Sequence, residues 1–408
     1  MRIDPNKHGW MTAPETLSVF AALGAARFVG GAVRNALLGA AVIDIDIAVP
    51  LPPLEAMNRL QDAGIKVVPT GLDHGTVTAI RNDKVFEVTS LRQDVETDGR
   101  HAAVAYTADW REDSARRDFT MNALYAGLDG EIFDYHGGVE DLIAGRVRFV
   151  GEPSARIRED HLRILRLFRF HAWYGKGDMD GEALRAAANA KTDIAKLSGE
   201  RIAKELLRLL ECPNPVPVLR VMAAAAILPE VLPGALQPAR LEHLVLIDAE
   251  NDFPPDSVLR LAALLPDEGE AVRAVGERLK LSNADRARLV DAVAVGTRSN
   301  SPSPLEVRKL LYRVGVARFR DWVLLRWAAG AKGAGAIQGR MLLSVADSWR
   351  RPKFPLTGQD VMTSGVPEGP AVGRVLQALE EWWMDKDFPD DAPALSAKLK
   401  AIVQAGEF

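Results

Sequence analysis

The chain has 408 residues, with 51 lysine and arginine against 55 aspartate and glutamate residues and a formal net charge of −4. This length predicts two to four domains with sizeable cores, and the balanced charge means that any contact with nucleic acid must use a local basic patch. The single cysteine, Cys212, excludes a disulfide framework, and the absence of a signal-peptide core or a long apolar run predicts a cytoplasmic protein without membrane spans.

The first informative segment is a glycine turn that begins directly after the short apolar run Phe28-Val29. Gly30 and Gly31 permit positive φ angles and a close approach of backbone N–H groups to an anion. A short helix is predicted from Ala32 to Leu38, where Gly39 stops it, and it carries Arg34. A strand, a glycine turn and a helical arginine in this order are suited to holding phosphate groups.

A pair of carboxylates follows the glycine turn. Strict alternation predicts a strand from Ile43 to Val49, with isoleucine and valine on one face and Asp44 and Asp46 side by side on the other. Paired oxygen ligands suit Mg²⁺, and two such ions would clamp the attacking and leaving oxygens of a displacement. The alternative is an edge strand with two solvated acids.

Alternating patterns continue through the N-terminal part of the chain, which we expect to be an α/β head. Glu87, on one of the predicted strands, is a candidate third carboxylate near the metals. A polar run, Arg92 to His101, has too little apolar surface to pack tightly. The strands are predicted at 77–80, 84–88, 103–106 and 131–135.

From Pro153 onward strand patterns vanish and helical periodicity dominates. Helices are predicted at 158–174, 182–190, 198–210, 215–225, 256–265, 306–314 and 372–385. The chain is therefore expected to have an α+β fold, with a mixed head followed by all-α segments.

The first of these helices carries a candidate base-reading pair. Asp160 and Arg163, three residues apart, would share a helix face. Cytosine and adenine both present an amino donor beside a ring acceptor, so a carboxylate and a guanidinium could pair with either base and reject uracil and guanine. Arg166 continues this face, whereas Arg169 lies about 180° from Asp160 on a straight helix and is assigned to phosphate or RNA. The alternative is an amphipathic helix with ordinary ion pairs.

A basic segment lies between Pro302 and Lys353, where few acidic residues occur. It is a candidate surface for the phosphate backbone of RNA, and the alternative is a set of solvated helix faces. The candidate RNA-binding residues are Arg308, Lys309, Arg313, Arg318, Arg320, Arg350 and Arg351.

Five motifs in order resemble those of the class II tRNA nucleotidyltransferases, which share a polymerase-beta-type core with bacterial poly(A) polymerases. The motifs are Gly30-Gly31-Ala-Val-Arg34 with Asp44-Ile-Asp46, Arg116-Arg117-Asp118-Phe119-Thr-Met-Asn122, Asp134-Tyr-His-Gly137-Gly138-Val-Glu-Asp141, Glu159-Asp160-His-Leu-Arg163 and Gly199-Glu200-Arg201-Ile-Ala-Lys-Glu205. Asn35 departs from the family, which more often has aspartate there. We expect this helix-surface amide not to touch the metals.

The resemblance implies the roles of further residues and the domain layout. Arg117 would contact the triphosphate and Asn122 the sugar or base, although a helix N-terminal charge cluster is the alternative for both. The loop at Arg92 to His101 would be a mobile element needed when specificity passes from C to A. The expected domains are a catalytic head at 1–141, a base-recognising neck at 142–211, a body at 212–300 and a tRNA-binding tail at 301–408.

The activity implied is template-independent addition of C, C and A to the tRNA 3′ end from CTP and ATP, with Mg²⁺ held by Asp44 and Asp46. Three alternatives stay open: a poly(A) polymerase, an enzyme that adds only part of CCA, and a catalytically silent RNA-binding protein. Intact Asp44 and Asp46 disfavour the last. The absence of an extra arginine-rich Arg-Arg-Phe element between Gly64 and Arg92 disfavours the first.

Overall fold

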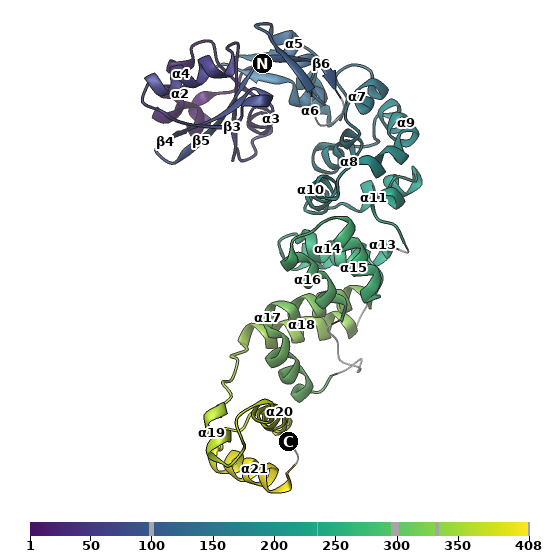
Figure 1. The fold of residues 1–408 in the computed structure, drawn as a ribbon. Helices are drawn as coiled ribbons and strands as arrows, with labels where there is room; N and C mark the ends of the chain where they lie inside the picture. The colour runs from purple at the N-terminus through teal and green to yellow at the C-terminus, as the bar shows by residue number, and fades with distance from the viewer. Residues whose placement is uncertain (98–101, 235, 295–301, 331–333, 407–408) are drawn as a thin grey trace. The chain divides into compact units, whose positions relative to one another are not determined.

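The computed structural model describes residues 1–97, 102–234, 236–294, 302–330 and 334–406. Within them the chain forms two compact units, residues 1–234 and residues 235–408. The first unit contains the sheets and a set of helices, and the second is helical (Figure 1).

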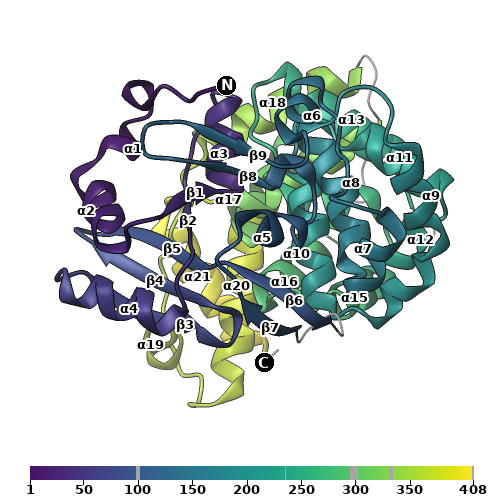
Figure 2. The same cartoon turned by 90° about the horizontal axis from the view of Figure 1, so that it is seen from above.

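A mixed seven-stranded sheet, in the order β3-β4-β5-β2-β1-β8-β9, organises the N-terminal part of the first unit. Strand β2 runs parallel to β5, and the other neighbours pair antiparallel. Helix α4 lies against β3, β4 and β5, and Figures 1 and 2 both show it beside this end of the sheet. The strands are β1 Arg27–Val29, β2 Ile45–Val49, β3 Lys66–Gly71, β4 Thr76–Arg81, β5 Lys84–Ser90, β8 Leu124–Ala126 and β9 Ile132–Asp134, and the helices are α1 Gly9–Thr12, α2 Pro14–Leu23, α3 Gly31–Leu37, α4 Pro53–Asp62, α5 Trp110–Ala115 and α6 Gly138–Ala144.

Both faces of the central strands are covered, which fixes their register. Phe28 on β1 stacks against Phe20 of α2, with ring centroids 4.5 Å apart. On the opposite face, Ala48 of β2 packs with Tyr125 of β8. The strands predicted within 77–80, 84–88, 103–106 and 131–135 are confirmed.

The segment around Arg117 and Asn122 does not begin an α-helix, as a helix N-terminal charge cluster would require. Only a 3₁₀ turn, Thr120–Asn122, forms there, and the chain then enters β8. Strands β3 and β8 were not predicted, because β3 contains Pro69 and β8 is only three residues long.

The polar run that begins at Arg92 forms a strand rather than a loop. Strand β6, Arg92–Thr97, pairs antiparallel with β7, Ala102–Tyr106, as a separate two-stranded sheet. Its register shifts between Asp94 and Glu96. The predicted mobile element also includes residues 98–101, which lie outside the described residues.

After β9 every described element is helical, which confirms the α+β fold class. Helices α8 and α10 pack together, and α7 contacts α9. The predicted helix 158–174 is interrupted: α7 ends at Glu159 and α8 begins at Leu162. In the first unit the helices are α7 Pro153–Glu159, α8 Leu162–Tyr174, α9 Gly181–Asn189, α10 Gly199–Leu210, α11 Val216–Ala224 and α12 Leu228–Val231.

The second unit is built from helices around several apolar clusters. One cluster joins α19, α20 and α21 through Val361, Val375 and Leu399. Helix α17 is kinked at Gly315, where φ is +80°. The helices are α13 Pro238–Glu250, α14 Ser257–Leu264, α15 Gly269–Arg278, α16 Asn283–Ala294, α17 Pro304–Ala329, α18 Ala334–Ser348, α19 Gly358–Thr363, α20 Pro370–Asp385 and α21 Ala392–Ala405. Among the described helices, none has the length and apolar character needed to cross a bilayer.

Candidate active site

The glycine turn lies between β1 and α3, as the sequence predicts. Gly30 has φ +65° and ψ −120°, a conformation that other residues rarely adopt. Its N–H donates to the carbonyl of Leu124 at 3.1 Å. A Cβ atom at Gly30 would lie 3.7 Å from Nη1 of Arg117, which is an ordinary contact, so the positive φ angle rather than lack of space favours glycine here.

Asp44 and Asp46 occupy the start of β2 and the loop before it. The predicted strand is two residues too long, since β2 begins at Ile45 and Ile43 is 88% exposed. Asp46 lies directly opposite Glu87 of the parallel strand β5. The two strands therefore bring Asp46 and Glu87 side by side, and Asp44 lies just before β2.

The environment of Asp46 favours its neutral form when no cation is present. Burial raises its pKa to about 6, and the negative charge of Glu87 acts in the same direction, while Arg117 opposes both. Acidic oxygens crowded together in this way are a suitable donor set for a hard divalent cation. Among the described residues no group of three His, Cys, Asp or Glu side chains forms a ready metal cage.

Asp44 and Asp46 line a cleft of about 850 Å³ within the first unit. The cleft brings together every predicted catalytic and nucleotide-binding residue except Glu87, which does not line it. The predicted residues on its wall are Gly30, Gly31, Arg34, Asp44, Asp46, Arg117, Asn122, Asp160, Arg163, Arg166 and Arg169. Asn35, Asp118, Trp173, Arg201 and Arg208 also line it.

A hydrogen-bonded chain crosses the cleft wall from α3 to α8. Arg34 donates to Oδ1 of Asn122 at 2.6 Å, Asn122 donates to Asp118 at 3.0 Å, and Arg166 donates to Asp118 at 2.9 Å. Although burial alone would raise the pKa of Asp118, the charge of Arg166 and these bonds lower it to about 2. Asp118 was not among the predicted site residues, although it lies in the motif between Arg117 and Asn122.

Asn35 orients Arg34. Its Oδ1 accepts from Nε and Nη2 of Arg34 at 3.2 and 3.0 Å, and its Nδ2 donates to the carbonyl of Ala41. The amide of Asn35 is thus part of the cleft wall, and it orients Arg34, which is predicted to bind phosphate.

A buried carboxylate fixes Arg117. Nη2 of Arg117 donates to Asp113 at 3.0 Å, and the hydroxyl of Tyr125 donates to the same oxygen at 2.6 Å. Burial would raise the pKa of Asp113, but Arg117 and Arg116 lower it to about 2. The sequence contained one signal for this residue, since Asp113 precedes Arg117 by four positions.

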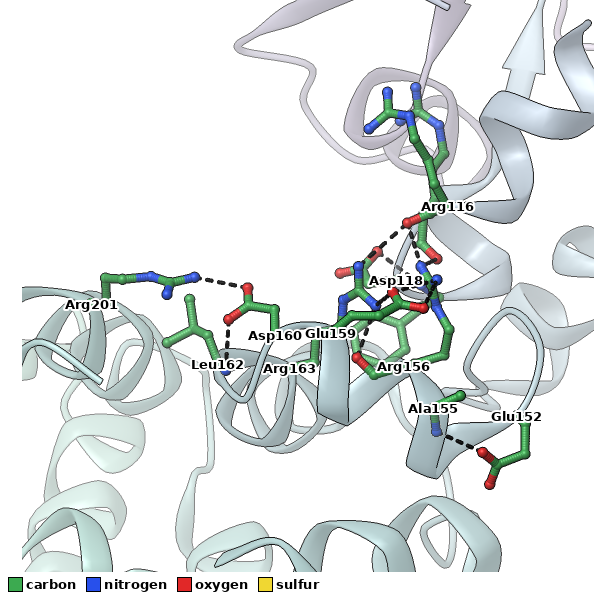
Figure 3. A network of polar contacts seen from close by, with 12 residues as sticks. Arg116, Asp118, Glu152, Ala155, Arg156, Glu159, Asp160, Leu162, Arg163 and Arg201 are labelled. Atoms are coloured by element: carbon green, nitrogen blue, oxygen red, sulfur yellow. Dashed lines mark hydrogen bonds and ion pairs between the residues drawn. The ribbon is translucent and has the colours of Figure 1, made fainter. Parts of the chain in front are cut away.

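Asp160 and Arg163 both reach the cleft, but not from one helix face. Asp160 has extended φ and ψ angles between α7 and α8, and its side chain accepts from the N–H of Leu162 at 3.1 Å and from Arg201 at 2.8 Å. Arg163 donates to Glu159 at 2.6 Å and to the carbonyl of Arg156 at 2.9 Å. Figure 3 shows Arg201 approaching Asp160 from one side and Arg156, Glu159 and Arg163 gathered on the other.

The break at Asp160 also explains the position of Arg169. A straight helix would turn Arg169 away from Asp160, whereas the structure places both on the cleft wall. Arg169 is buried and its Nε donates to Glu205 of α10 at 2.5 Å.

Most of the predicted RNA-binding cations pair with carboxylates of the second unit. Arg308 pairs with Asp387 at 2.6 Å, Arg313 with Glu381 at 2.5 Å and Arg318 with Asp291 at 3.0 Å. Lys309 pairs with Asp385, and Arg320 with Asp347. Among the described residues, Arg350 and Arg351 have no carboxylate partner, and Arg351 stacks on Tyr312 at 4.9 Å.

Comparison with known proteins places these features in one family. Residues 26–148 match the family described as "Poly A polymerase head domain", and residues 178–237 match "Probable RNA and SrmB- binding site of polymerase A". The human protein named "CCA tRNA nucleotidyltransferase 1, mitochondrial" is 34% identical over 389 residues, which cover 92% of this chain and 86% of the human one. The CCA-adding enzyme of Streptococcus gordonii is 32% identical over 380 residues, with 92% and 93% covered.

Solved structures agree. The crystal structure of the Bacillus stearothermophilus CCA-adding enzyme in complex with CTP has a TM-score of 0.77 and 26% identity, and the match covers 96% of this chain and 98% of that one. A CCA-adding enzyme in complex with ATP shares the fold, with a TM-score of 0.70 at 22% identity over 100% of this chain and 99% of that one. From the identity and coverage of these relatives, this chain belongs to the CCA tRNA nucleotidyltransferase family.

Proposed function

We propose that this chain adds C, C and A to the 3′ end of tRNA, using CTP and ATP and no nucleic-acid template. The observation that carries the proposal is the single cleft in which Asp44 and Asp46, the glycine turn and the Asp160 and Arg163 side chains meet. The relatives at about a third identity over most of the chain support the same activity.

In this reaction the 3′ hydroxyl of the RNA attacks the α-phosphate of the nucleotide in line, and pyrophosphate leaves. Asp44 and Asp46 would hold Mg²⁺, which when bound stabilises charge on the reacting oxygens. Arg34 and Arg117 would contact the triphosphate. Because Asn35 and Asp113 fix these two guanidiniums, they are oriented before the substrate arrives.

Base choice would depend on hydrogen-bond direction at the break between α7 and α8. Asp160 can accept from the amino group of cytosine or adenine, while Arg163 donates to the ring nitrogen. Uracil and guanine would leave buried polar groups unpaired, at roughly 1–3 kcal/mol each. Nη2 of Arg201 donates to Oδ2 of Asp160 at 2.8 Å, and this charge-assisted hydrogen bond orients the carboxylate.

We further propose the four-part division into a head at 1–141, a neck at 142–211, a body at 212–300 and a tail at 301–408. The cytoplasm stays our predicted compartment; the names of the human and mouse relatives assign those proteins to mitochondria.

A tRNA transcript that ends at its discriminator base tests the activity. We expect CTP alone to add two residues, ATP alone to add none efficiently, and the two together to complete CCA. A long adenosine tail from ATP alone would instead indicate a poly(A) polymerase. No extension with any nucleotide in the presence of Mg²⁺ would contradict the proposal, and chelation with EDTA should abolish all addition.

A further inference from the structure

Trp173 is an exposed aromatic side chain on the wall of the cleft that the base-reading and phosphate-binding roles do not use. It lies in the last turn of α8, the residue is 42% exposed, and it lines the cleft. The other two cleft aromatics have internal partners. Phe170 is buried, and the ring of Tyr174 lies against the guanidinium of Arg34 at 4.3 Å.

The indole is held in place by one hydrogen bond. Its Nε1–H donates to the backbone carbonyl of Arg208 in α10 at 2.7 Å. Three ion pairs precede it along the two segments: Asp160, between α7 and α8, pairs with Arg201, and Arg166 and Arg169 of α8 both pair with Glu205 of α10. The order of the partners along both segments shows that the two helices run in the same direction, so the cleft wall has a base-reading end and a Trp173 end.

The surroundings of the indole fit a nucleotide. The cleft wall carries the guanidiniums of Arg34, Arg166, Arg169 and Arg208. Sites for single-stranded nucleic acid combine such cations, which follow the phosphates, with aromatic rings on which bases stack. The bond at Nε1 occupies the edge of the ring, and Trp173 is 42% exposed, so a base could still cover part of the indole.

The candidate occupant is a base of the RNA strand, because one base cannot pair at Asp160 and Arg163 and also stack on Trp173. Ten residues of helix separate Arg163 from Trp173, which is about 15 Å along the axis at 1.5 Å per residue. A base that pairs at Asp160 and Arg163 is therefore several stacking distances, of about 3.4 Å each, from the indole.

We propose that Trp173 stacks on a base near the 3′ end of the tRNA and positions the strand for each addition. This inference rests on the proposed function, since the incoming base must occupy the Asp160 end. The recognised partner is a single-stranded 3′ segment of RNA, and the role of Trp173 is positioning rather than catalysis.

Three variants separate stacking from structural support. Trp173→Phe loses the bond to Arg208 but keeps an aromatic ring, Trp173→Leu keeps apolar bulk without a ring, and Trp173→Ala removes both. For tRNA lacking CCA we expect KM to rise about five- to a hundredfold in the Ala and Leu variants and about threefold or less in Phe. KM for CTP should change less than about twofold in all three. Leu17→Ala, an exposed position on α2, is the matched control and should behave as wild type.

A double-mutant cycle identifies the stacked base directly. Transcripts with one abasic nucleotide at each of the four 3′-terminal positions are bound by wild type and by Trp173→Ala, whose melting temperature confirms folding. At one position the abasic site should weaken tRNA binding by wild type about five- to a hundredfold. At that same position it should not weaken binding by Trp173→Ala any further, because the variant has already lost the stacking contact. Additive losses at every position, a rise in KM for CTP instead of tRNA, or a Phe variant as weak as Ala would overturn the inference. Because wild type is measured for CCA addition in the same assay, failure of the proposed function itself would be seen separately.

Discussion

Asp46 shows at the scale of one residue how the site trades stability for function. Its carboxylate lies beside Glu87 and is partly removed from water, so ionisation is unfavourable in the metal-free fold. The folded-state pKa of Asp46 is about 6, above the usual value near 4. The ionised carboxylate therefore destabilises the fold. This destabilisation is absent at low pH, grows between about pH 4 and 6, and is fully present above that range.

Asp46→Asn should therefore stabilise the metal-free protein while abolishing both C and A addition. In EDTA at pH 8 we expect the free energy of unfolding to rise by about 2 kcal/mol, and the gain to disappear by about pH 3.5. Denaturant titrations at the two pH values measure this. A variant that is less stable than wild type at pH 8, or that keeps turnover within tenfold of wild type, would contradict the assignment.

Asp118 affects the pH dependence of stability in the opposite direction. Its pKa of about 2 lies below the unfolded value, so the carboxylate stabilises the fold above about pH 4, and this contribution is lost as the pH falls toward 2. Asp118→Asn should cost about 2 kcal/mol at pH 7, and the difference from wild type should shrink at pH 3. Asp62→Asn, on the exposed side of α4, should change stability by less than about 0.5 kcal/mol. An equal loss at both pH values would show that Asp118 acts through shape rather than charge.

At the same scale, the sequence predicted which residues line the cleft but not which hydrogen-bond partners orient them. Arg34, Arg117 and Asp160 were found from motif spacing, and all three line the cleft. Their partners Asn35, Asp113 and Arg201 were not assigned, because a hydrogen bond between elements depends on packing that no local pattern encodes. Glu87 lies opposite Asp46 but does not line the cleft, and its role as a third carboxylate near the metals stays a prediction.

At the scale of elements, the hairpin β6–β7 carries the prediction for the switch from C to A. Its first strand is anchored where the N–H of Arg92 donates to Asp113, the carboxylate that also holds Arg117. Removing two residues from each strand should suppress addition of the final A at least tenfold more than addition of the two Cs. Single-nucleotide extension of tRNA ending in CC, compared with tRNA lacking CCA, measures this. Equal losses of C and A, or no loss, would reduce the hairpin to a connector.

The cations of the basic segment fall into two groups, which we expect to contribute differently to tRNA binding. Arg313 pairs with Glu381 on the surface, so Arg313→Ala should leave tRNA affinity nearly unchanged and cost at most about 1 kcal/mol of stability. Arg351→Ala should weaken tRNA binding and reduce the slope of log affinity against log salt by about 1. Filter binding at several salt concentrations distinguishes them, and equal effects would show that the ion pairs do not decide which cations bind RNA.

Element boundaries show where periodicity stops being informative. The apolar pattern continues from Arg158 to Tyr174, but the chain leaves the helix at Asp160, whose side chain caps Leu162 instead. Aspartate near a helix start is a capping signal. At Asp160 this signal favoured a new helix, whereas the continuous apolar periodicity favoured a single one. No such conflict of signals occurs at 182–190, 198–210 and 372–385, and the helices predicted there are confirmed.

At the scale of the whole molecule, the mixed head and the helical remainder followed from the change in periodicity near Pro153 and from the five motifs. The acidic partners of Arg308 and Arg313 in α17, which lie in α20 and just after it, could not be read from the basic segment alone, because they lie 79 and 68 positions further along the chain. The family relationship covers both compact units.

The central claim is that one pair of side chains, Asp160 and Arg163, selects both cytosine and adenine. The most direct test is incorporation of each of the four nucleoside triphosphates by Asp160→Ala and wild type, on tRNA lacking CCA and on tRNA ending in CC. We predict that the variant loses about ten- to a hundredfold of its preference for CTP over UTP on the first substrate and for ATP over GTP on the second, as expected for 1–3 kcal/mol. Undiminished exclusion of UTP and GTP, or loss of selectivity for only one of the two bases, would contradict it.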